Sequence, residues 1–166
     1  HAVRAIDAVD TPPRRGELAR ALGYWAARYR PGQPARPLSP GGDLQMAIVE
    51  AAADGARRYL ARPDIFHLHG VTGAMAVEIL AAHIPATDGA AALAQVHAEH
   101  AALYAATEPV TQPHPASPPG SELAVAAVRS LDPHQVKLVE ACRRGHAATG
   151  DPAFAAAAET VTGLYA

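Results

Sequence analysis

The sequence of 166 residues has one cysteine, few aromatic residues and no long apolar run. A single cysteine, Cys142, cannot form an internal disulfide, so we expect a fold without disulfide cross-links and read Cys142 as a small buried residue. The longest apolar segment, "GVTGAMAVEILAAHI", is interrupted by Glu78 and His83. It is shorter than the roughly 20 residues that a membrane-spanning helix needs. We therefore predict a soluble, cytoplasmic protein with no membrane partner.

An excess of charge of either sign is also missing. The formal net charge is −2 and the isoelectric point is near 6.5, which argues against a nucleic-acid partner because such proteins carry a basic surface. The sequence has no glycine-rich dinucleotide motif after a strand, no phosphate-binding loop and no CxxC pair. A flavin or nicotinamide bound on a nucleotide-binding fold is therefore not expected.

The alternation of β-branched and polar residues that marks β-strands is absent, whereas helical signals are frequent. The predicted helices cover residues 11–30, 43–60, 63–82, 89–106 and 121–129, and two more begin with the Asp-Pro pairs at Asp132 and Asp151. Proline-rich segments near 30–42 and 107–120 are predicted loops. We predict one all-α, bundle-like domain over residues 1–166. The opening "HAVRAIDAVD" looks like the end of a helix, so we expect a fragment of a larger helical domain.

Lys137 is the only lysine among fourteen basic residues; the rest are arginines. An amine can lose its proton when buried and react as a nucleophile, which a guanidinium cannot do. His134 precedes it by three residues, so on a helix both side chains project to one side. The alternative reading is a surface pair. However, a cation near a helix N-terminus is disfavoured by the helix dipole, and a neutral or carbamylated lysine would suit the position better.

Nine histidines are unusual for a chain of this length. His67 and His69 in "FHLHGVTGA" are two residues apart and cannot face the same site from one helix. His69 precedes Gly70, which leaves room beside its ring; it is either a metal ligand or a hydrogen-bonded core residue. His97 and His100 share a helical face that either chelates a metal or is simply the solvent side of the helix.

Four segments resemble the questin oxidase-like family in the right order, and together they span most of the chain. They are "HAVRAIDAV", "ELARALGYWAARY", "FHLHGVTGAMAVEIL" and "DPHQVKLVEACRRGHAATGDPAFAAAAETVTG". The resemblance implies an all-helical enzyme that uses dioxygen to cleave a quinone or similar aromatic polyketide ring. It also implies a non-haem Fe(II) held by histidines and a carboxylated lysine, with NADPH as a candidate external reductant. Further family blocks with histidines, expected upstream, are absent from this chain.

Residue by residue, the resemblance assigns His69, His134, Lys137 and His1 as metal ligands, while the catalytic residues remain unknown. Carbamylation would turn a neutral lysine into an anionic oxygen donor, and imidazole with such a donor suits Fe(II), with zinc as a competitor. The expected partners are dioxygen and a small aromatic substrate, with Leu68, Met75, Tyr24 and Trp25 as candidate pocket walls. The alternatives are a non-catalytic helical scaffold or small-molecule binding module, and an oxidase without a metal.

Overall fold

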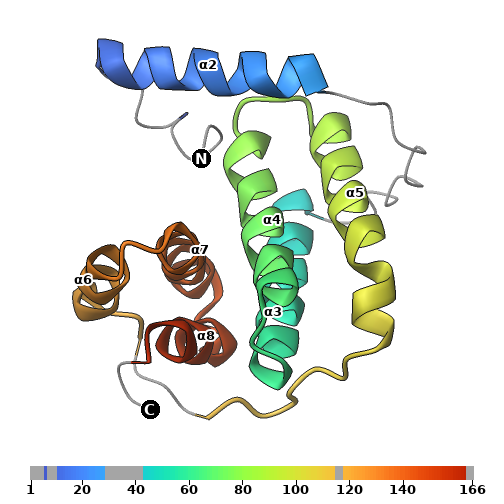
Figure 1. Ribbon diagram of the computed structural model, residues 1–166. Coiled ribbons are helices and arrows are strands. Elements are labelled where there is room, and N and C mark those ends of the chain that lie inside the picture. Colours follow the sequence, from blue (N-terminus) through green and yellow to red (C-terminus); the bar gives the residue numbers. More distant parts are fainter. Residues whose placement is uncertain (1–5, 7–10, 29–42, 115–117, 164–166) are drawn as a thin grey trace.

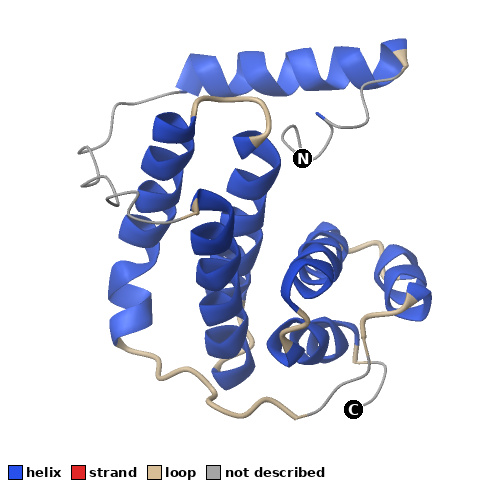
Figure 2. Ribbon diagram, turned by 180° about the vertical axis from the view of Figure 1, so that it is seen from behind, coloured by secondary structure: helices blue, strands red, loops and turns tan. Residues whose placement is uncertain are grey.

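The computed structural model describes Ile6 and residues 11–28, 43–114 and 118–163, apart from the side chains of Trp25 and Arg28. Over these residues the chain forms helices and no strand, which confirms the predicted all-α class (Figures 1 and 2). The helices are α2 (Pro12–Arg28), α3 (Leu44–Ala61), α4 (Ile65–Ala81), α5 (Ala86–Ala105), α6 (Ser121–Arg129), α7 (Pro133–Thr149) and α8 (Pro152–Thr162). None of the helices in these ranges is long and apolar enough to cross a membrane.

Aspartate side chains start four of these helices. Asp43, Asp64, Asp132 and Asp151 each have extended backbone angles and accept a hydrogen bond from a backbone N–H of the first turn. Such caps satisfy amide groups that have no partner within the helix. The two Asp-Pro pairs therefore begin helices as predicted. One prediction was wrong by three residues: α5 begins at Ala86 rather than Gly89, because the helix can start directly after Pro85.

The core lies where α3 and α4 pack together and where α7 and α8 cover them (Figure 1). Helix α5 packs on α4, and α6 packs on α7 and α8. Small residues allow these close approaches: a Cβ atom on Gly145 of α7 would collide with the ring of the fully buried Phe154 of α8. The largest fully buried side chains include Phe154, Ile48, Met75, Leu93, Leu123 and Leu138.

Only part of the two predicted loops falls within the described residues. Residues 30–42 lie outside the described residues. In the second loop, residues 107–114 and 118–120 form no helix or strand, as expected. Helix α2 runs across one end of the α4–α5 pair in both views (Figures 1 and 2), and most of its described side chains are exposed.

Candidate functional site

His69 lies in the second turn of α4, on the side of the helix opposite to the buried His67. The Asp64 cap fixes this orientation, because it accepts hydrogen bonds from the backbone N–H groups of Phe66 and His67. The side chain of His67 is fully buried between Asp64 and Thr107: its Nδ1 lies 2.8 Å from Asp64 Oδ1 and its Nε2 lies 3.0 Å from Thr107 Oγ1. His67 is thus a hydrogen-bonded core residue, while His69 is half-buried and faces α7.

His134 stands in the first turn of α7, directly after the cap. Asp132 Oδ1 accepts the backbone N–H of His134 at 2.8 Å and also lies 3.2 Å from His134 Nδ1. These hydrogen bonds hold the pKa of Asp132 below its ordinary value, and the bond from the His134 backbone has the larger effect. An ionised Asp132 favours the tautomer with the proton on Nδ1, which leaves the lone pair of Nε2 free.

The packing of α4 against α7 brings His69 and His134 into contact. Their ring centroids are 5.6 Å apart and the ring planes are nearly perpendicular, at 86°. The residues are 65 positions apart in the sequence, so this contact is produced by the fold alone. His69 and His134, two of the four residues predicted as metal ligands, are therefore neighbours in the structure.

The pKa of His69 is lowered from its ordinary value. Burial is the largest cause, followed by the positive charges of Lys137 and His134, with a smaller one from His100, while a hydrogen bond to the Ile65 backbone raises it. Lys137 is partly buried and one turn beyond His134 on α7. The charge of the Lys137 amine on α7 lowers the pKa of His69 on α4 without a hydrogen bond between them being needed. The imidazole of His69 stays neutral at neutral pH, the form that binds a metal.

His100, on α5, is a neighbour that sequence reasoning left undecided. Its charge acts on His69, its Nδ1 lies 2.8 Å from the Val96 carbonyl oxygen, and its ring lies 5.6 Å from that of Tyr104. The i, i+3 spacing places His97 and His100 on one face of the helix. The sequence does not indicate which of these two histidines lies near His69; the structure places His100 there. The carbonyl contact engages one ring nitrogen and leaves Nε2 as the available donor.

The remaining expectations about the site have different outcomes. His1 lies outside the described residues. Within the described ranges, no three His, Cys, Asp or Glu side chains form a group that could hold a metal ion. Lys137 is the charged neighbour that most lowers the pKa of His69. Leu68 and Met75, two of the candidate pocket walls, are 4% and 1% exposed and belong to the hydrophobic core.

Two surface grooves lie elsewhere. One, of about 520 Å³, is formed by α6, α7 and Pro118–Pro119, and the other, of about 470 Å³, involves Leu60, residues 110–114 and α8. Neither groove is lined by His69, His134 or Lys137. The half-buried cluster of these three residues is the better candidate for chemistry, because it joins a pKa-shifted imidazole to specific charged neighbours.

Comparison with known proteins finds no matching family model, no matching curated protein and no matching solved structure. A functional interpretation therefore depends on the side chains themselves.

Proposed function

We propose that this chain forms part of an iron-dependent oxygenase of the questin oxidase-like class, acting on a quinone or another aromatic polyketide-type substrate. His69, His134 and Lys137 would hold the metal, with His1 as a further candidate ligand. The single observation that carries the proposal is the edge-to-face contact of His69 with His134 across α4 and α7, beside the only lysine of the chain.

The donor chemistry of these residues fits a divalent transition metal. Each imidazole has one partner that orients it: Asp132 for His134 and the Ile65 backbone for His69. Oriented imidazoles with a free ring nitrogen are preferred ligands of iron and zinc. The lowered pKa of His69 adds to this fit, since no proton need be displaced from that ring at neutral pH.

Lys137 would supply the anionic donor by carbamylation. In that reaction the neutral Nζ attacks the carbon of CO₂, an N–C bond forms as one C=O π bond opens onto oxygen, one proton passes from the nitrogen to water, and the lysine ends with a carboxylate. Lys137 is partly buried one turn beyond His134 on α7, so a carboxylate on its Nζ would lie near both imidazoles. Arginine cannot follow this route, which gives a physical reason for a lysine at this position.

When bound, iron would supply the activation of dioxygen for ring oxidation. The protein residues would bind and orient the metal, keep His69 unprotonated, and exclude bulk water through the packing of α4 against α7. NADPH would act only as a soluble reductant, because the sequence carries no nucleotide-binding motif.

The test is metal and mass analysis of the purified protein and of single variants. After anaerobic incubation with Fe(II) and bicarbonate, the wild-type protein should hold near-stoichiometric iron. His69→Ala, His134→Ala and Lys137→Arg should each lose most of it. Intact-mass measurement under non-acidic conditions should show the added mass of one CO₂, lost in Lys137→Arg.

His114→Ala is the matched control, because His114 lies on an exposed loop; it should keep its iron. If the three cluster variants retain iron like the control, the ligand assignment is wrong. If the folded wild-type protein takes up no metal yet binds an aromatic polyketide, the chain is a non-catalytic binding module instead. Activity that survives removal of all metal would indicate an oxidase without iron.

A further inference from the structure

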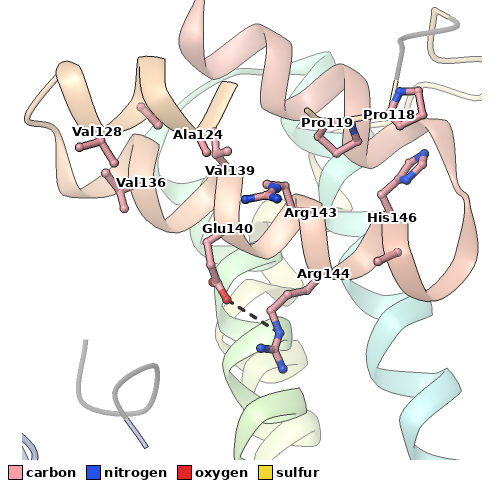
Figure 3. Close-up of a pocket in the computed structure, with 12 residues that line it drawn as sticks. Pro118, Pro119, Ala124, Val128, Val136, Val139, Glu140, Arg143, Arg144 and His146 are labelled. Carbon is pink, nitrogen blue, oxygen red and sulfur yellow. Dashed lines mark ion pairs between the residues drawn. The ribbon is translucent and has the colours of Figure 1, made fainter. Parts of the chain in front are cut away.

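The groove between α6 and α7 has a floor made of small and β-branched apolar side chains. Ala127 and Val139 are buried at its base, whereas Val128 and Val136 remain 60% and 38% exposed along its length. Pro118 and Pro119 line the groove at the end beside His146, away from Val128 and Val136, as Figure 3 shows. The volume of about 520 Å³ lies within the range of roughly 300–1,000 Å³ typical of small-molecule sites.

Charge is distributed unevenly along the rim of this groove. Glu140, Arg143, Arg144 and His146 line it from α7. Arg144 is committed to acidic partners: its Nε and Nη2 lie 3.0 and 2.6 Å from Glu78 Oε2, and its Nε lies 3.8 Å from Glu140 Oε1. The pair of Arg144 with Glu140 is marked in Figure 3.

Arg143 differs from its neighbour. It is exposed, and within the described part of the chain it forms no hydrogen bond or ion pair. The acidic side chain on this rim, Glu140, already contacts Arg144. The groove therefore combines an apolar floor with a guanidinium that has no partner among the described residues. His146, farther along α7 beside Pro118 and Pro119, adds a second donor at that end of the groove (Figure 3).

We propose that this groove binds a small amphiphilic carboxylate, with the apolar body over Val128, Val136 and Val139 and the carboxylate on Arg143. An apolar body would cover the exposed valines, which contributes through burial of apolar surface. A guanidinium recognises a carboxylate through two parallel N–H donors, which a neutral ligand cannot exploit. The site is separate from the histidine cluster and does not depend on the proposed iron chemistry.

The test uses 2-naphthoate as the probe and 2-naphthalenemethanol as its uncharged counterpart. Calorimetry and amide chemical-shift mapping should show saturable binding of naphthoate, with shifts concentrated on α6 and α7. Arg143→Gln should weaken naphthoate binding by at least about tenfold, in line with loss of a charge-assisted hydrogen bond, and should leave the weaker binding of the alcohol unchanged. Val128→Asp should weaken both probes.

Arg129→Gln is the matched control, since Arg129 is an exposed arginine on α6 that does not line the groove; it should bind naphthoate like the wild-type protein. The proposal is overturned if naphthoate does not bind, if its shifts map away from α6 and α7, or if Arg143→Gln and Arg129→Gln bind equally well. Because shift mapping uses the unmodified protein, the result does not depend on any variant folding correctly.

Discussion

Tyr104 of α5 lies where α3 and α4 approach one another closely, next to His69. Its hydroxyl oxygen lies against Gly55 of α3 and Gly70 of α4, at positions where a Cβ atom would intrude. The guanidinium of Arg58 lies 4.7 Å from the centre of the Tyr104 ring and donates to the backbone carbonyl oxygens of Tyr104 and Thr107. Burial, with the nearby Asp54, raises the pKa of Tyr104 to about 12, so the hydroxyl remains protonated.

Gly70→Ala should therefore destabilise the protein. The added Cβ would meet the Tyr104 hydroxyl well inside van der Waals contact, and overpacking of this kind costs about 1–3 kcal/mol. Gly73→Ala is a matched control on the same helix, because its Cβ would make only an ordinary contact with Val96. Since alanine is the better helix former by about 0.5–1 kcal/mol, Gly73→Ala should be neutral or stabilising. Urea unfolding of both variants measures the difference, and equal midpoints would contradict this packing.

At the level of the helix, α7 shows how one capping residue serves both the fold and the site. Asp132 starts the helix through the backbone N–H of His134 and orients the ring of the same histidine. Leu131, just before it, has a left-handed backbone with φ of 58° and is 88% exposed. This conformation is costly for a leucine, and it allows the chain to turn sharply from α6 into α7.

Acid should weaken α7 through Asp132. Its pKa is lowered in the folded state, so the unfolded chain takes up the proton more readily. The stabilisation is therefore complete above the ordinary aspartate pKa and is lost as the pH falls through the lower folded-state pKa. Asp132→Asn should keep a cap but lose this part of the acid dependence, whereas Asp132→Ala should weaken the helix at every pH. Urea midpoints measured from neutral to acidic pH test this, and identical pH profiles for wild-type protein and Asp132→Asn would refute it.

The arrangement of helices depends on ion pairs that join distant parts of the chain. Arg57 of α3 reaches Asp151 at the start of α8, with 2.6 Å between Nη2 and Oδ2, while the other carboxylate oxygen of Asp151 caps α8. Arg144 of α7 similarly holds Glu78 of α4. The second pair ties together the two helices that carry His69 and His134.

A double-mutant cycle should detect the pair of Arg57 with Asp151. Both side chains are partly buried, at 29% and 18% exposed, so we expect a coupling energy of about 1 kcal/mol, at the upper end for surface pairs. Arg57→Met and Asp151→Asn, singly and combined, keep the α8 cap while removing the charges. Urea unfolding at low and high salt gives the coupling energy. A value near zero at low salt would show that the pair does not stabilise this arrangement.

The sequence by itself determined the helical class, the helix starts at Asp132 and Asp151 and the opposed directions of His67 and His69, because helix periodicity and capping are local properties. It also singled out Lys137 and His134 on one helical side. Only the tertiary structure decided that His69 meets His134, that His67 is buried against Thr107, and that His100 stands near the cluster. The first two of these contacts join residues 40 or more positions apart in the sequence. They depend on how the alanine-rich helices pack against one another, which no local sequence pattern specifies.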